Sequence, residues 1–358
     1  MTLHADPGPA IEQGPLHSTA APAASDASPQ GLSGLVFVRE WGIVLLLVVL
    51  AVAFSIWGSP VFGTFTNAVL ILNAAAVSAI FAAAIAIGIL SGSLDLSVPG
   101  VAALGGVVTG KLVVAGTPAW IAVILGLVLG LVVGVCNGVL TVRGINPLAV
   151  TIGMLSVATG VAAVISGGVP VSGLKSLSFL GTDRYLEVPA PVWVMAIVFI
   201  LGTVFLTQTR DGIRMLAAGG NPEALRRSGV AAGRYRVLGF ALSGMLAALG
   251  GVVTAASTTS ASPAAGSSVL FTGLTAVALS GVSLAGGRGS LPKVLIGALI
   301  IASISSVLVI KNVQPYWTTV ITGLLLVGAL AAQLLLSRAI SQRVVAQRGG
   351  RVKAVMAK

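Results

Sequence analysis

The sequence predicts an all-α polytopic membrane protein. Hydrophobic residues make up 56% of the chain and charged residues only 8%, and the mean hydropathy is +1.06. Soluble domains carry about 25% charged residues, so these values exclude an ordinary water-soluble fold. Ten apolar stretches approach the length of about 20 residues that a helix needs to cross a bilayer. One long polar interval, residues 210–236, interrupts them.

The expected spans follow one another through short connections. The first begins just after Arg39 and lacks the pattern of a cleaved signal peptide, so we expect it to stay in the mature protein. In chain order the ten predicted spans are 41–56, 67–90, 94–114, 119–142, 147–166, 191–207, 237–257, 269–284, 291–310 and 316–336.

The chain divides into a membrane domain, residues 34–337, and two tails. Residues 1–33 are rich in Ala, Pro, Ser and Gly without an apolar period, which predicts a disordered cytoplasmic tail. Residues 338–358 are basic and predict a second cytoplasmic tail.

The distribution of basic residues predicts the orientation. With both termini in the cytoplasm, only four of the 20 Lys and Arg residues lie outside, and the other 16 lie inside. Short cytoplasmic loops carry the excess of Lys and Arg in membrane proteins, so this orientation is favoured. The net charge of +11 then needs no nucleic-acid partner. The four outer residues are Lys111, Lys175, Arg184 and Lys311.

The polar interval 210–236 is expected to be a cytoplasmic loop. An arginine at the centre of a membrane helix costs about 2.5–3.5 kcal/mol, so six of them exclude a hydrocarbon location. Within the loop, Asn221 is a good N-cap, Pro222 suits the first helical position, and Glu223 faces the positive end of the helix dipole. Gly229 is placed to end this short helix. The six arginines are Arg210, Arg214, Arg226, Arg227, Arg234 and Arg236.

Asp95 is the one acidic residue inside the predicted spans, and two interpretations stay open. An ionisable group at membrane depth indicates a functional site by default. The simpler interpretation, which we favour, is a cap of the third span in which the carboxylate accepts from the backbone N–H of Ser97 or Val98.

Neutral polar side chains along the spans suit a path for an uncharged, hydroxyl-rich solute, although hydrogen bonds between helices would explain many of them. With Asp95, the candidate path residues are Asn73, Ser93, Asp95, Ser97, Asn137, Asn146 and Thr151. A separate stripe of glycines recurs every four residues in the fourth span. We interpret it as helix packing rather than a dimer face; it consists of Gly126, Gly130, Gly134 and Gly138.

Several kinds of site are not expected in this chain. The histidines, His4 and His17, both lie in the N-terminal tail, which excludes a histidine metal site in the membrane. Residues 105–111 approach a phosphate-binding loop, but Leu112 replaces the required Ser or Thr. We therefore expect no catalytic residue, bound cofactor or metal. The outer loop 167–190 is either a docking surface for an extracytoplasmic partner or a solvated connector.

Four motifs together resemble the permease subunit of bacterial ABC sugar importers of the ribose, xylose and arabinose branch. That branch is related to the branched-chain amino-acid permeases, and the likeness covers roughly residues 67–333. The motifs are Leu-Asp-Leu-Ser at 94–97, Asn137-Gly138 followed by Asn146-Pro147 and Thr-Ile-Gly-Met at 151–154, Ala-Gly-Gly-Asn-Pro-Glu-Ala at 218–224 with Ser228-Gly229, and Leu-Ala-Gly-Gly-Arg-Gly-Ser at 284–290.

The resemblance implies a type II importer of about ten helices in the bacterial inner membrane, working as a homodimer or with a second permease. A separate cytoplasmic ATPase would bind ATP and Mg²⁺, and a periplasmic or lipid-anchored protein would deliver the sugar. The resemblance also implies an ATPase-coupling helix formed by Gly220, Asn221, Pro222, Glu223, Ala224, Arg226, Arg227, Ser228 and Gly229.

Departures from the family leave the substrate open. Two acidic residues that the family usually carries near the eighth span are absent from residues 266–275, and Pro99 stands where glycine is more common. The alternatives are an ABC permease for a branched-chain amino acid or a nucleoside, and, from another class, an ion-coupled secondary carrier.

Overall fold

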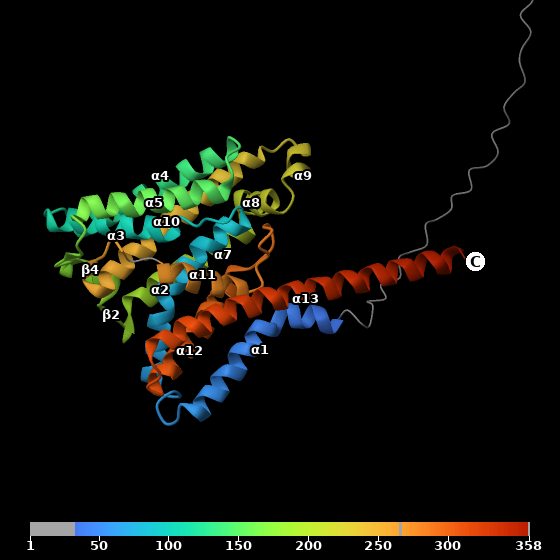
Figure 1. Ribbon diagram of the computed structural model, residues 1–358, viewed down its shortest axis with the longest axis horizontal. Helices are drawn as coiled ribbons and strands as arrows, with labels where there is room; N and C mark the ends of the chain where they lie inside the picture. The colour runs from blue at the N-terminus through green and yellow to red at the C-terminus, as the bar shows by residue number, and fades with distance from the viewer. Residues whose placement is uncertain (1–32, 265–266, 357–358) are drawn as a thin grey trace, which may run out of the picture.

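The computed structural model describes residues 33–264 and 267–356, and the predicted disordered tail therefore lies outside it except for its last residue. The described chain is almost entirely helical (Figure 1). Its helices are α1 (Ser33–Trp57), α2 (Phe65–Leu90), α3 (Val98–Val114), α4 (Ala119–Val142), α5 (Pro147–Ser166), the 3₁₀ helix η1 (Lys175–Leu177), α6 (Ser178–Gly181), α7 (Ala190–Gln208), α8 (Arg210–Gly220), α9 (Pro222–Arg227), α10 (Ala232–Thr258), α11 (Ser267–Leu279), α12 (Leu291–Ile310) and α13 (Pro315–Met356).

The expectation of about ten apolar helices is confirmed for the described residues. Eight helices are long and apolar enough to cross a membrane, and two shorter apolar helices, Val98–Val114 and Val269–Leu279, complete the set. The predicted bounds of α4, α5 and α12 agree with the structure. Proline at the start of α5 and near the start of α12, and at the cap of α4, marks these boundaries because it suits a first helical turn.

Several predicted spans had wrong bounds, since hydropathy does not report where the backbone turns; α1 and α10, for example, begin at Ser33 and Ala232 rather than at residues 41 and 237. The third span was expected from residue 94, but α3 begins at Val98 because the preceding residues turn around Asp95. The eighth was expected to reach residue 284, but α11 ends at Leu279. Gly281 follows with φ +75°, a conformation that ends a helix. At the C-terminal end, α13 continues beyond residue 336 to Met356.

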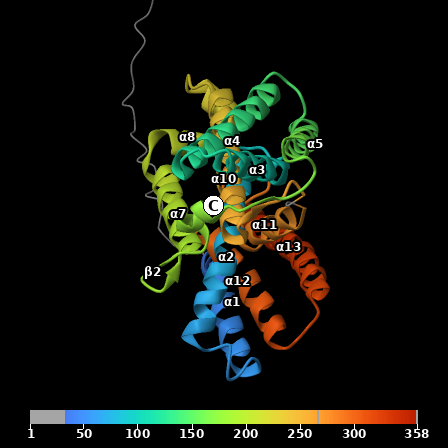
Figure 2. The same ribbon diagram turned by 90° about the vertical axis from the view of Figure 1, so that its left-hand side faces the viewer.

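Helix α10 lies at the centre of the bundle (Figure 2). It packs most extensively on α4 and then on α3 and α2, while α2 also contacts α12, α11 and α7. At the edge, α1 packs on α12, where Lys293 Nζ donates to Glu40 Oε2 at 2.7 Å. Helix α13 packs on α11.

The glycine stripe of α4 packs inside the chain, which supports its interpretation as a packing feature. A Cβ on Gly130 or Gly134 would collide with the backbone of α10 at Gly244 or Phe240, and one on Gly138 would lie 2.7 Å from the Cα of Val237. In lipid, close backbone approach and van der Waals contact replace the hydrophobic effect as the force between helices. Because these glycines have no side chains, the backbones of α4 and α10 can come into contact.

The connections gather at two ends of the bundle. Figure 1 shows α8 and α9 at one end and strands β2 (Arg184–Tyr185) and β4 (Ser260–Ala261) at the other. At the second end, β1 (Val171–Ser172) pairs with β4, and β2 pairs with β3 (Val188–Pro189), both antiparallel. We refer to the α8–α9 end as the inner end and to the strand end as the outer end.

We expect the substitution Gly134→Val to separate α4 from α10. The added side chain meets backbone atoms that have no room to move, and overpacking of this kind costs about 1–3 kcal/mol. The matched control is Gly328→Val on α13, where a Cβ meets nothing within 4 Å. Thermal unfolding in detergent should show a lower midpoint for Gly134→Val only; equal midpoints would contradict the packing assignment.

Single cysteines test the orientation. In a Cys136→Ser background, we expect an impermeant thiol reagent to label Asp183→Cys in whole cells, because the outer end faces away from the cytoplasm. Arg227→Cys on α9 should be labelled only after the membrane is opened. Labelling of Arg227→Cys in intact cells would reverse the assigned topology.

Candidate functional site

The polar interval 210–236 is mostly helical, which corrects the expectation of a loop with one short helix. Helix α8 begins after Thr209, whose Oγ1 accepts from the backbone N–H of Gly212 at 3.0 Å. Met215 is buried while Arg210 is exposed, so α8 is amphipathic and lies along the inner surface. Arg234 belongs to the first turns of α10.

Helix α9 has the capping that its residues predict. Asn221 Oδ1 accepts from the backbone N–H of Ala224 at 3.0 Å, and Pro222 occupies the first helical position. Gly229, with φ +80°, follows the C-cap residue Ser228. The two ends of α9 are therefore set by the local sequence, since each cap lies within a few residues of the backbone group that it serves.

The charged side chains of α9 are presented to solvent. Glu223 is paired with Arg226, and Arg227 Nε lies 3.4 Å from Glu223 Oε1. The side chains of Arg226 and Arg227 are 67% and 79% exposed, and exposed pairs contribute little to stability. Half-buried Leu225 packs on the main core, so α9 is anchored through one side and free on the other.

Tyr235 fastens α8 to α10, a role that we did not infer from the sequence. Its hydroxyl donates to Asp211 Oδ1 at 3.1 Å and accepts from Arg214 Nη1 at 3.2 Å. The side chain is only 3% exposed. The hydrogen bond from Arg214 to Tyr235 also raises the pKa of the guanidinium, which stays charged. A lone tyrosine between Arg234 and Arg236 was the signal in the sequence.

Three chain segments meet at the inner end through glycine backbones, and we call this contact the inner junction. It joins the α2–α3 loop at Gly92, the end of α8 at Gly219, and the α11–α12 loop at Gly287. A Cβ on Gly219 would lie 2.9 Å from the backbone nitrogens of Gly92 and Gly287. The N–H of Gly287 also donates to the carbonyl of Leu90 at 3.1 Å. The glycine-containing motifs at 218–224 and 284–290, far apart in sequence, are thus in direct contact.

Asp95 lies in the α2–α3 loop and joins three helices. Its Oδ1 accepts from the backbone N–H of Ser97 at 2.9 Å and from Ser97 Oγ at 2.6 Å, while Oδ2 accepts from Ser243 Oγ on α10 at 2.9 Å. Asn137 Nδ2 on α4 donates to Ser97 Oγ at 2.9 Å. All four side chains are fully buried. The predicted bond to the Ser97 N–H is confirmed, whereas the link to Ser243 was not foreseen.

The remaining candidate path residues do not share one location. Asn146 is exposed and caps α5 by accepting from the N–H of Leu148 at 2.9 Å. Thr151 is buried and donates to the carbonyl of Leu148 at 3.4 Å. Ser93 lies buried in the α2–α3 loop, and Asn73 is half-buried on α2. Of the seven candidates, hydrogen bonds between side chains join Asp95, Ser97 and Asn137, and Ser93 lies in the same loop without such a bond to them.

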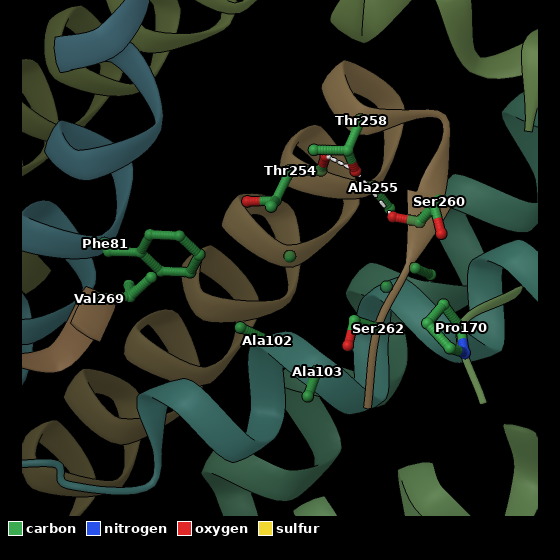
Figure 3. A pocket seen from close by; sticks show the side chains of 13 residues that line it. Phe81, Ala102, Ala103, Pro170, Thr254, Ala255, Thr258, Ser260, Ser262 and Val269 are labelled. Atoms are coloured by element: carbon green, nitrogen blue, oxygen red, sulfur yellow. Dashed lines mark hydrogen bonds between the residues drawn. The ribbon is translucent and has the colours of Figure 1, made fainter. Parts of the chain in front are cut away.

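A cavity of about 280 Å³ lies toward the outer end, between α2, α3, α10 and the segment after α10. Figure 3 shows Phe81 and Val269 on one side of it and Pro170 and Ser262 on the other. Thr258 Oγ1 lies 2.9 Å from the carbonyl oxygen of Thr254 and 2.8 Å from that of Ser260, so its single hydrogen is engaged by these carbonyls while its oxygen can still accept. The hydroxyl residues that line it are Thr254, Thr258, Ser260 and Ser262.

A second cavity of about 500 Å³ lies on the other side of Ala103, which lines both. Its wall includes Pro99 of α3, Ser156 and Thr159 of α5, and Phe271 of α11. None of the seven candidate path residues is among the described residues that line either cavity. The run of Thr and Ser between residues 254 and 262 was the sequence signal for this region.

The chemistry of the two cavities is that of a neutral environment. The described residues around them include hydroxyl, aromatic and aliphatic side chains but no charged one. Burying a charge without a partner is costly, so such a lining suits an uncharged solute. Within residues 33–264 and 267–356, no group of three or more His, Cys, Asp or Glu side chains is placed to hold a metal ion.

Comparison with known proteins identifies the family. Residues 67–330 match the family described as "Branched-chain amino acid transport system / permease component". The chain is 33% identical to the ribose import permease protein RbsC of Escherichia coli K12 over 304 residues, 82% of this chain and 94% of RbsC. It is 35% identical to the L-arabinose transport system permease protein AraH of the same strain, over 83% of this chain and 92% of AraH.

A third relative is the D-allose transport system permease protein AlsC of Escherichia coli K12, with 31% identity over 84% of this chain and 94% of AlsC. No solved structure matches the chain significantly. The family match spans most of the described helices and all of the inner junction, from the α2–α3 loop to the α11–α12 loop. The chain therefore belongs to the permease family of the branched-chain amino-acid transport systems and is a multi-pass membrane protein.

Proposed function

We propose that this chain is the membrane-spanning subunit of an ATP-driven importer for a sugar in the bacterial inner membrane. The observation that carries the proposal is the inner junction, where α8 is joined by backbone contacts to the α2–α3 and α11–α12 loops, and α8 in turn contacts the coupling helix α9. Such a contact moves as one unit, because close-packed backbones transmit displacement rather than absorb it.

The substrate class follows from the relatives and from the cavities. The names of the three relatives specify ribose, L-arabinose and D-allose, and all three are uncharged sugars rich in hydroxyls. The described cavity residues offer hydroxyl oxygens and no charge. A branched-chain amino acid carries both an ammonium and a carboxylate group, which this lining would leave unpaired. The sugar is therefore the better fit.

The partners follow from what the chain does not supply. ATP hydrolysis would belong to a separate cytoplasmic ATPase with ATP and Mg²⁺, docking on the exposed face of α9 through Glu223, Arg226 and Arg227. A second permease subunit, either another copy or a different chain, would complete the pore. An extracytoplasmic sugar-binding protein would deliver the sugar at the outer end, where the loop 167–190 is its candidate docking surface.

The coupling role of α9 is tested by removing its charges. We expect Glu223→Ala with Arg226→Ala to abolish ATPase stimulation by the sugar-loaded binding protein, because the helix loses its polar contacts with the ATPase. The control is Arg143→Ala with Arg338→Ala, which removes two exposed inner charges outside α9. ATPase activity of the purified complex is the measurement. Full stimulation in an assembled α9 variant would show that the ATPase docks elsewhere.

The cavity is tested by filling it. We expect Thr254→Phe to lower uptake of the best-transported sugar among ribose, L-arabinose and D-allose at least tenfold, because the added ring occupies space beside Phe81. The control is Ala331→Phe, which adds the same ring at an exposed position of α13. Uptake of radiolabelled sugar by cells carrying each variant gives the answer. Undiminished uptake with Thr254→Phe would remove this cavity from the transport path.

A further inference from the structure

The hydrogen bonds around Asp95 form one buried chain that crosses three elements. Asn137 on α4 donates to Ser97, Ser97 donates to Asp95, and Ser243 on α10 donates to the other carboxylate oxygen of Asp95. None of the ion pairs in the described part of the chain involves Asp95. The carboxylate is therefore held from its own loop by the backbone N–H and hydroxyl of Ser97 and from α10 by the hydroxyl of Ser243, and Asn137 on α4 is linked to it through Ser97.

At its inner end, this series of hydrogen bonds is connected to the inner junction. The loop that carries Asp95 also carries Gly92, and Gly92 lies against the backbone of Gly219 at the end of α8. The carbonyl of Leu90, at the start of the same loop, accepts from the N–H of Gly287. The backbones of α8 and the loop are so close that a Cβ would not fit between them. A displacement of α8 must therefore displace the loop, because no free space remains to absorb the movement.

Toward the outer end, the helices joined by these hydrogen bonds extend to both cavities. Ser243 lies on α10 eleven residues before Thr254, which corresponds to about 16 Å along the helix. Thr254 lines the first cavity. Ser97 directly precedes α3, and Pro99 in the first turn of α3 lines the second cavity.

Helix α10 is thus attached to the inner elements at two points. Tyr235 binds its first turn to α8 through Asp211 and Arg214. Ser243, eight residues or about 12 Å further along, binds it to the α2–α3 loop through Asp95. One attachment fixes the position of a helix end, whereas two separated attachments also fix the direction of its axis.

We propose that Asp95 is a positioning residue that ties α10 and α4 to the inner junction, so that movement imposed on α8 and α9 reaches the two cavities. This inference rests on the proposed function, because it requires an ATPase that moves α9. Asp95 then does not line the solute path, and its role goes beyond the bond to the N–H of Ser97, the residue before α3. Its carboxylate transmits the movement because it accepts at once from Ser97 in the α2–α3 loop and from Ser243 on α10.

The experiment measures sugar molecules imported per ATP hydrolysed by the complex purified through a tag on this chain and reconstituted in vesicles. Ser243→Ala removes the link to α10, and we expect this ratio to fall about tenfold. The matched control is Ser257→Ala on the same helix, whose hydroxyl donates only to the carbonyl of Val253. A merely structural role would lower the amount of complex but leave the ratio unchanged.

Two further variants keep the test decisive. Ser243→Cys preserves side-chain size if Ser243→Ala does not fold, and we expect the same loss because a thiol is a weak donor. Asp95→Asn can still accept from Ser97 and donate to Ser243, so its ratio should stay within about threefold of the wild type. A wild-type ratio with Ser243→Ala or Ser243→Cys, or an equal loss with Ser257→Ala or Asp95→Asn, overturns the proposal. If the wild-type complex imports none of the three sugars, the proposed function itself is contradicted.

Discussion

The structure depends on the close backbone contact between α10 and its neighbours α4 and α3. In α4, Gly130 and Gly134 meet the backbone of α10, and in α10 Gly251 meets the backbone of Ala102 on α3. Helices in a membrane gain little from the hydrophobic effect against one another, so this proximity and its van der Waals contacts hold the bundle. It also places α10 where it contacts α2, α6, α8 and α9.

The position of α10 gives its few polar side chains their importance. Tyr235, Ser243 and Thr254 lie successively along one helix, facing α8, the α2–α3 loop and a cavity. A buried polar group must find a partner, and each of the first two finds one on a different element. The helix thus connects the inner surface, where we propose that an ATPase acts, with the region where we propose that a sugar passes.

Local features were predictable wherever the cause lay within a few residues. The caps of α9 follow from Asn221, Pro222 and Gly229, and the apolar run between residues 119 and 142 matches α4. Helix α8 was missed because its charged face hid the apolar positions around Met215. The start of α3 was placed too early because Leu94 and Leu96 are apolar although the backbone turns at Asp95.

The sequence by itself determined the membrane class, the ten apolar helices and α9, because hydropathy and capping are local properties. Its resemblance to sugar permeases agreed with the family that the relatives show. Only the tertiary structure decided that Asp95 bonds to Ser243, 148 residues away, and that Gly92, Gly219 and Gly287 touch. It also separated Asn146, at a helix cap, from the buried group at Asp95. Such contacts join residues that are distant in sequence, and they arise when whole helices pack, which no single segment encodes.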